Sequence, residues 1–124
     1  MGLLIFLKNG CPAPLNMTHP QLQEILAQLR RHLKATYSDH LGSLILFGSQ
    51  ARGEADIDSD IDVLIVLNEP FDVPQERKRL SQFLAQLCLD YDTLITCIWA
   101  DAQDWRTRQS PLFINIRREG IVVS

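Results

Sequence analysis

Hydrophobic residues along the chain follow two spacings, and each spacing predicts a different element. Apolar residues three or four positions apart mark one face of a helix, and the segments with this spacing are 20–34, 73–87 and 111–119. Continuous short apolar runs, or runs rich in β-branched and aromatic residues, indicate buried strands, and these are 44–47, 61–67 and 93–99. The order helix, strand, strand, helix, strand, helix predicts one mixed layer structure of helices and strands.

Capping signals support the predicted helix ends. Thr18 and Gln21 have the spacing of a capping box, with Pro20 in the first turn. The segments 72–75 and 110–111 repeat this chemistry before the second and third helices. We therefore expect each helix to begin close to one of these signals.

The first residues of the chain differ from the rest. Residues 1–16 show neither spacing, and Gly10, Pro12 and Pro14 interrupt them. A helix entry then follows Met17, which makes this residue a candidate natural start. We expect an irregular N-terminal arm at 1–16, whose native status is open, and one domain at 17–124.

Composition narrows the class of protein. A chain of 124 residues, 46% of them hydrophobic, fits one globular domain and excludes wholesale disorder. A net charge of −3 does not suit general coating of nucleic acid. Cys11, Cys88 and Cys97 are an odd number without metal-ligand spacing, which favours a reduced cytoplasm over disulfides or zinc. No apolar run is long enough for a membrane helix.

The negative charge is concentrated in one segment. Residues 52–62 contain one arginine and five acids, a net charge of −4, so that all other residues together carry +1. Three of these acids, Glu54, Asp56 and Asp58, lie in the connection between two predicted strands, where we interpret them as solvated loop residues. The other two, Asp60 and Asp62, lie at the head of a strand.

Asp60 and Asp62 form a candidate cation site. Strand residues two apart point to the same face, so these carboxylates stand side by side and repel unless a cation lies between them. Oxygen ligands suit Mg²⁺ or Mn²⁺. Gly48 and Ser49 follow the preceding strand at the same edge, and a glycine turn with free backbone N–H groups can bind phosphate oxygens. The signatures of a P-loop and of a dinucleotide-binding turn do not occur.

Other polar and aromatic residues have a structural interpretation. The three histidines lack partners at metal-ligand spacing: His19, His32 and His40. Trp99 and Trp105 favour core packing, although Trp105 could also lie at a nucleotide or partner surface. The arginines near the C-terminus are interpreted either as a solvated helix end or as a face for a partner or phosphate, and they are Arg106, Arg108, Arg117 and Arg118.

Gly48-Ser49, ten further residues and Asp60-Ile61-Asp62 resemble the pattern of the minimal nucleotidyltransferases of the DNA polymerase beta superfamily. The turn sequence at 48–53 is especially similar to the small prokaryotic antitoxin branch. The resemblance extends from about residue 20 to the end of the chain. It implies an α+β fold with a small mixed sheet flanked by helices.

The resemblance also implies a set of site residues. Asp60 and Asp62 would be catalytic metal ligands for two Mg²⁺ ions, with Mn²⁺ as an alternative, and Gly48 and Ser49 would bind the β- and γ-phosphates of ATP. In the family three acids hold the two ions, and the third, also a catalytic metal ligand, lies on the next strand. Here Asp92 is the best match for it and Asp90 the second choice. Arg52 is expected either to contact a phosphate or to pair with a loop acid.

The activity that the resemblance implies is transfer of AMP from ATP to a hydroxyl. The short chain leaves no room for a separate acceptor domain, so we expect a second protein to present the acceptor. In the antitoxin branch that protein is a HEPN toxin, a ribonuclease that is silenced by AMP on a tyrosine. Two alternatives stay open: an antitoxin that acts by binding alone, and an adenylyltransferase for a small alcohol. Neither direct nucleic-acid binding nor membrane association is expected.

Overall fold

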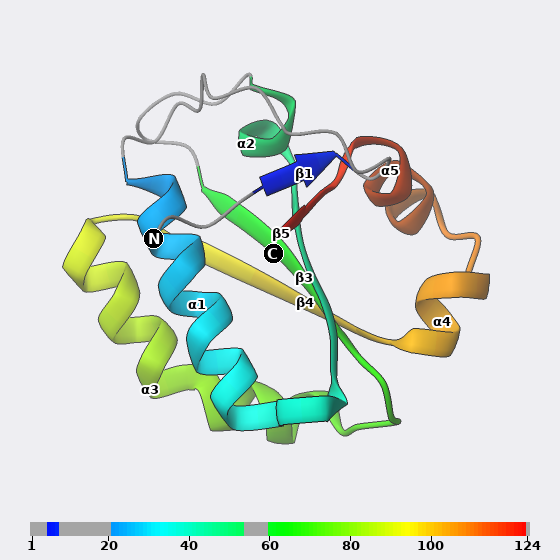
Figure 1. Ribbon diagram of the computed structural model, residues 1–124, viewed down its shortest axis with the longest axis horizontal. Helices are drawn as coiled ribbons and strands as arrows, with labels where there is room; N and C mark the ends of the chain where they lie inside the picture. The colour runs from blue at the N-terminus through cyan, green and yellow to red at the C-terminus, as the bar shows by residue number, and fades with distance from the viewer. Residues whose placement is uncertain (1–4, 8–20, 54–59, 124) are drawn as a thin grey trace.

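The computed structural model describes residues 5–7, 21–53 and 60–123, which form a five-stranded mixed sheet with helices on both faces (Figure 1). The spatial order of the strands is β1-β5-β2-β3-β4. Their bounds are β1 (Ile5–Leu7), β2 (Leu41–Phe47), β3 (Ile61–Leu67), β4 (Ile95–Asp101) and β5 (Ile121–Val123). The helices are α1 (Leu22–Tyr37), α2 (Ser49–Arg52), α3 (Val73–Tyr91), α4 (Ala102–Thr107) and α5 (Pro111–Glu119), with a 3₁₀ turn, η1 (Ser38–His40). This α+β architecture is the fold class predicted from the sequence.

The centre of the sheet is the pair β2 and β3. β3 runs antiparallel to β2 and parallel to β4, and β5 is antiparallel to both of its neighbours, β1 and β2. Every residue of β3 except Asp62 is buried. A strand covered on both faces needs apolar side chains on both, which explains why 61–67 is a nearly continuous hydrophobic run.

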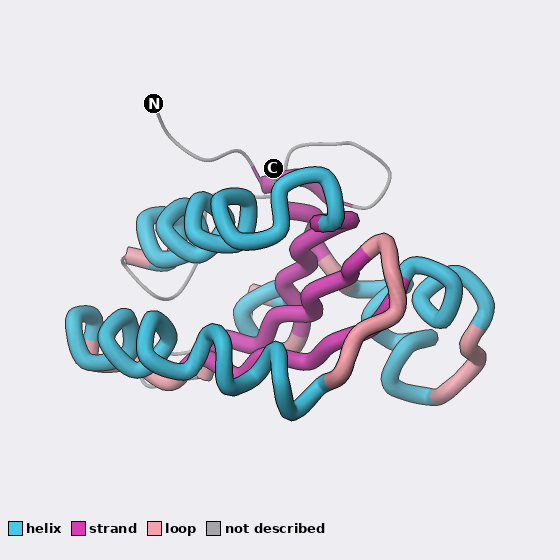
Figure 2. The backbone as a smooth tube through the Cα atoms, turned by 90° about the horizontal axis from the view of Figure 1, so that it is seen from below, coloured by secondary structure: helices cyan, strands magenta, loops and turns pink. Residues whose placement is uncertain are grey.

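The two faces of the sheet carry separate hydrophobic cores. The long helices α1 and α3 cover one face, and the short helices α4 and α5 cover part of the other (Figure 2). The larger core joins α1 and α3 to alternate sheet residues such as Ile61, Val63 and Ile65. The smaller core joins Leu64 and Val66 to Phe113 and Ile116 of α5 and to other residues. Because side chains alternate between the two faces of a strand, Asp62 lies on the same face of the sheet as Leu64, Val66 and the smaller core.

The structure differs from the predicted elements mainly in short segments. The helix α4 and the strand β5 were not predicted, and α3 continues to Tyr91, so that β4 begins at Ile95. Ser110 caps α5 as predicted, because its hydroxyl accepts a hydrogen bond from the Phe113 N–H at 3.2 Å. The helix α1 begins at Leu22, with Gln21 as its N-cap and no side-chain capping hydrogen bond. Gln21 was predicted inside the first turn, and the other residues of that signal, Thr18 and Pro20, lie outside the described residues.

The N-terminal arm, predicted to be irregular, contains one ordered element. Residues 5–7 form β1, which pairs with β5 from Ile5 opposite Val123 to Leu7 opposite Ile121. The open edge of β5 supplies backbone donors and acceptors that a short apolar segment can satisfy. The remainder of 1–16, with Cys11, lies outside the described residues.

Two further observations concern the described part of the chain. None of its helices has the length and apolar character needed to cross a membrane. Cys88 and Cys97 are both free thiols and half-buried, and both pack against the larger core, as their interpretation as small hydrophobic residues predicted.

Candidate functional site

The Gly-Ser turn and the acid pair meet at one end of the sheet. Phe47, the last residue of β2, is paired with Asp62 of β3. Gly48 and Ser49 follow Phe47 directly, and Ser49 begins the single-turn helix α2, which lies beside this end of the sheet (Figure 1). The antiparallel arrangement of β2 and β3 therefore brings the end of one strand to the head of the next. The proximity predicted from sequence is confirmed.

Gly48 lies against the carboxylate of Asp62. Its backbone angles are φ 76° and ψ −157°, a region that is essentially restricted to glycine. A Cβ atom added at this position would lie 2.5 Å from Oδ2 of Asp62, a distance too short for a non-bonded contact. Two independent reasons therefore require glycine at this position: its backbone conformation, and the lack of space for a Cβ atom beside Asp62.

The turn after Gly48 is closed by backbone hydrogen bonds. The N–H groups of Ala51 and Arg52 donate to the Gly48 carbonyl at 3.1 and 3.2 Å. Gly53 ends the turn in the left-handed conformation, with φ 72°. Because the first N–H groups of a helical turn have no carbonyl partner within the turn, they are suited to anionic oxygens.

The two carboxylates influence each other electrostatically. Partial burial of Asp62 raises the pKa of its carboxyl above the ordinary value of 3.8, the charge of Asp60 raises this pKa further, and Arg52 acts in the opposite direction. Asp60 is exposed, whereas Asp62 is half-buried. Two repelling carboxylates at the rim of a core fit a hard divalent cation, because the cation removes the repulsion and accepts oxygen ligands.

Arg52 has a partner that the sequence did not suggest. Its guanidinium Nη1 lies 3.3 Å from Oε2 of Glu119, the last residue of α5. The sequence favoured either a phosphate or a loop acid as its partner, and the loop acids at 54–58 lie outside the described residues. The ion pair connects the turn after Gly48 to the C-terminal helix.

The structure does not bring Asp92 or Asp90 into a cluster with the acid pair. Asp92 is exposed and caps α3 with φ 49°, three residues before β4 begins. Asp90 accepts a hydrogen bond from Gln86 within α3 at 2.8 Å. In the described segments, no group of three or more acidic, histidine or cysteine side chains could share a metal ion. The assignment of Asp92 as a third acid stays a prediction.

His32, His40 and Trp99, interpreted from the sequence as structural residues, make packing or polar contacts within the fold. His32 stacks on Phe83 with ring centroids 3.8 Å apart, and His40 pairs with Glu69 at 3.1 Å, while His19 lies outside the described residues. Trp99 is buried in the larger core. These contacts agree with the structural interpretation of these residues.

The C-terminal arginines are only partly a solvated surface. Arg117 donates to the backbone carbonyls of Trp105 and Arg108, and Trp105 packs edge-on against Phe113. Arg106, Arg108 and Arg118 are exposed. Arg117 therefore has a structural role between α4 and α5, and Trp105 packs against the smaller core.

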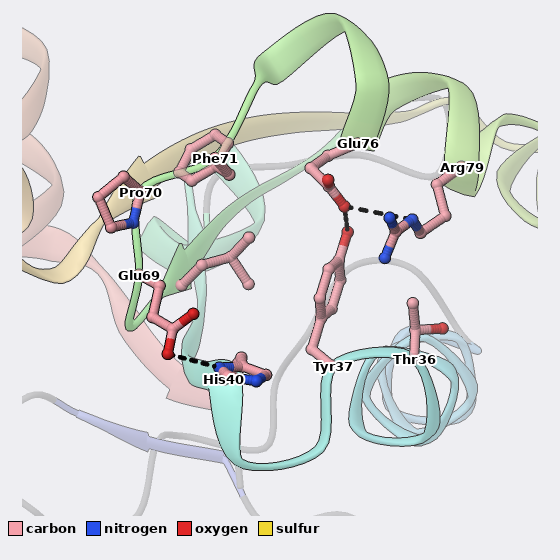
Figure 3. Close-up of a pocket in the computed structure, with 9 residues that line it drawn as sticks. Thr36, Tyr37, His40, Glu69, Pro70, Phe71, Glu76 and Arg79 are labelled. Atoms are coloured by element: carbon pink, nitrogen blue, oxygen red, sulfur yellow. Dashed lines mark hydrogen bonds and ion pairs between the residues drawn. The ribbon is translucent and has the colours of Figure 1, made fainter.

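A pocket at the opposite end of the sheet is formed around a buried acid (Figure 3). Its volume is about 170 Å³, and its walls include Tyr37, Phe71, Glu76 and Arg79. The Tyr37 hydroxyl donates to Oε1 of Glu76 at 2.7 Å, and Nε of Arg79 lies 3.5 Å from the same oxygen. Because these partners satisfy the buried carboxylate, the cluster serves as a polar connection between α1 and α3.

The fold and the sheet-end site together define a nucleotidyltransferase. The family described as Nucleotidyltransferase domain matches residues 26–110, a span that includes the Gly-Ser turn and both acids. This chain belongs to that family. The resemblance seen in the sequence is thereby confirmed.

Relatives and solved structures agree with this assignment. The chain is 35% identical over 78 residues, 63% of its length and 78% of the other, to a Methanocaldococcus jannaschii protein provisionally named protein adenylyltransferase MJ0141. The chain is also 33% identical over 75 residues to MJ1305 of the same organism, which is likewise provisionally named a protein adenylyltransferase. This match covers 60% of the present chain and 49% of MJ1305.

Two solved structures share the fold. A provisionally assigned nucleotidyltransferase from Sulfolobus solfataricus has a TM-score of 0.53 and 22% identity, over 82% of this chain and 80% of that one. The toxin–antitoxin MntA–HpeT, crystallised as a mutant, has a TM-score of 0.50 and 18% identity, over 76% of this chain and 68% of that one. At these identities the likeness concerns the fold alone.

Proposed function

We propose that this nucleotidyltransferase is a Mg²⁺-dependent protein adenylyltransferase and an antitoxin, which moves AMP from ATP to a tyrosine hydroxyl of a HEPN toxin. The observation that carries the proposal is the close approach of the Gly48 backbone to the Asp62 carboxylate. It places a turn suited to binding phosphate next to a pair of carboxylates suited to binding a divalent cation. Relatives named protein adenylyltransferase and a structural neighbour titled as a toxin–antitoxin support the protein acceptor.

Each residue of the site has a part in this reaction. Asp60 and Asp62 would hold Mg²⁺, which when bound neutralises phosphate charge and orients the triphosphate. The backbone after Gly48 and the hydroxyl of Ser49 would bind the β- and γ-phosphate oxygens. Arg52 would contact a phosphate after exchange with Glu119, and we retain Asp92 as the candidate that accepts the proton of the attacking hydroxyl. The acceptor oxygen forms a bond to the α-phosphorus as the bond to pyrophosphate breaks.

The experiment uses ATP labelled at the α-phosphate, Mg²⁺ and the product of the adjacent gene, which the proposal predicts to be a HEPN protein. We expect label on the HEPN protein, loss of its ribonuclease activity, and loss of both effects in Asp60→Asn/Asp62→Asn. Asp39→Asn is the matched control, because Asp39 is an exposed acid in η1, outside the site.

Two outcomes would replace the proposal by one of its alternatives. Neutralisation of the HEPN protein without transfer of label would show an antitoxin that acts by binding alone. Label transferred to a small alcohol, with none on the HEPN protein, would show a small-molecule adenylyltransferase. Loss of activity in Asp92→Asn with ATP binding retained would support the role of Asp92, whereas full activity would remove it.

A further inference from the structure

The neighbour of Asp62 on β4 is a threonine. The parallel register pairs Ile61 with Ile95, Asp62 with Thr96 and Val63 with Cys97, and the Ile61 N–H donates to the Leu94 carbonyl at 2.9 Å at the start of this ladder. Residues paired directly across two strands project from the same face of the sheet. Thr96, which is exposed, therefore lies beside the acid pair.

The other surroundings of Asp62 provide no third carboxylate in the described part of the chain. Its partner on β2 is Phe47. The acid of β4, Asp101, is at the far end of that strand and caps α4 by accepting a hydrogen bond from the Asp104 N–H at 2.8 Å. Among the described residues, the charges of Asp60 and Arg52 influence the carboxyl of Asp62.

The charge balance at this sheet end suits one divalent ion. Asp60 and Asp62 together carry a charge of −2, which one Mg²⁺ or Mn²⁺ neutralises. The positive charge of Arg52 acts on Asp62, but it is itself balanced by the ion pair with Glu119. Two-metal sites hold their ions about 3.5–4 Å apart, and a second ion at that distance needs a protein carboxylate in addition to the phosphate oxygens that the nucleotide supplies. The neutral hydroxyl of Thr96 occupies the sheet position from which a carboxylate would face such an ion.

We infer that this chain binds one divalent ion per nucleotide, in place of the two that the resemblance implies, and that Thr96 determines this number. The inference rests on the proposed function, since it concerns the same metal–nucleotide site. It also assigns the position beside Asp62 to Thr96 and leaves Asp92 outside the metal coordination.

The test counts Mn²⁺ ions on the full chain bound to an ATP analogue with a methylene group between the α- and β-phosphorus, which cannot be cleaved there. Free Mn²⁺ is followed by electron paramagnetic resonance during titration. We expect one Mn²⁺ per bound nucleotide in the wild type, in Asp92→Asn and in the control Thr96→Asn. Thr96→Asp is expected to bind two, with the spin coupling of a dinuclear pair.

Several results would overturn the inference. Two ions on the wild-type protein would contradict it directly, and this count does not depend on any variant folding. A drop from two ions to one in Asp92→Asn would assign the second site to Asp92 instead. A single ion on folded Thr96→Asp would remove Thr96 as the determinant. Failure to bind either Mn²⁺ or nucleotide would overturn the proposed function as well, which distinguishes the two failures.

Discussion

Replacement of Gly48 by alanine is expected to damage both the fold and the site. The backbone at Gly48, with φ 76° and ψ −157°, costs a residue with a side chain about 1–3 kcal/mol. The new Cβ would also lie 2.5 Å from Oδ2 of Asp62, so the carboxylate must move. At about 4 °C per kcal/mol for a domain of this size, the conformational cost alone lowers Tm by about 4–12 °C.

Gly53→Ala is the matched control for this prediction. Gly53 also has a positive φ, 72°, but a Cβ there would meet no atom of the described residues within 4 Å. The left-handed conformation costs an alanine about 1 kcal/mol, and the carboxylates are untouched. Thermal unfolding and Mn²⁺–nucleotide titration of both variants therefore separate the backbone cost from the contact with Asp62.

A double-mutant cycle tests the contact itself. In an Asp62→Ala background the clashing oxygen is absent, so Gly48→Ala should cost less stability there than in the wild type, by about 0.5–3 kcal/mol. Gly53→Ala should cost the same in both backgrounds. If Gly48→Ala and Gly53→Ala changed Tm and Mn²⁺–nucleotide affinity by the same amounts, a specific contact between position 48 and Asp62 would be refuted.

Three further predictions concern titratable groups. Burial and the hydrogen bond to Glu76 raise the pKa of Tyr37 above its ordinary value of 10.0. Above pH 10 the tyrosine therefore loses its proton in the unfolded chain but keeps it in the folded protein. The free energy of unfolding should then fall by up to about 1.4 kcal/mol per pH unit. Urea titrations between pH 8 and 11 should show this component in the wild type and lack it in Tyr37→Phe; identical slopes would contradict it. Burial and the neighbouring Cys88 raise the pKa of the Cys97 thiol to about 12, so iodoacetamide at pH 8 should leave Cys97 unmodified in the native protein, as peptide mass spectrometry would show. Because Asp62 is half-buried beside another acid, Asp62→Asn should raise Tm without metal while Mn²⁺ affinity falls; a lower Tm would argue against repulsion between the acids.

The elements with strong hydrophobic patterns could be predicted from the sequence. The run at 61–67 is apolar because β3 is covered on both faces, and the stripe in α1 matches its buried residues. The close approach of Gly48 to the acid pair followed from the same reasoning, since one buried strand ends where the next begins. Here local pattern and tertiary structure agree.

The neighbour of Asp62 on β4 could not be predicted in this way. The strand predicted at 93–99 begins two residues too early, because α3 continues to Tyr91, Asp92 ends the helix in the left-handed conformation and β4 begins at Ile95. The register between β3 and β4 places Thr96 opposite Asp62, and a shift of a few residues in the strand start changes which side chain lies there. The three-residue strands β1 and β5 depend on partners distant in sequence, so local pattern alone does not indicate them.

The exposed end of the sheet has a consequence for how an acceptor is selected. Asp60 and Thr96 are both exposed, and Leu94 beside them is 56% exposed. A small-molecule acceptor is ordinarily selected by a concavity that covers most of its surface, whereas these residues are open to solvent. A large acceptor can lie across such a surface and be recognised by the area it covers, including apolar contact with Leu94. For the protein acceptor of the proposed function, discrimination would then depend on the shape of the partner's surface, and short peptides around the target hydroxyl should be poor substitutes for the folded partner.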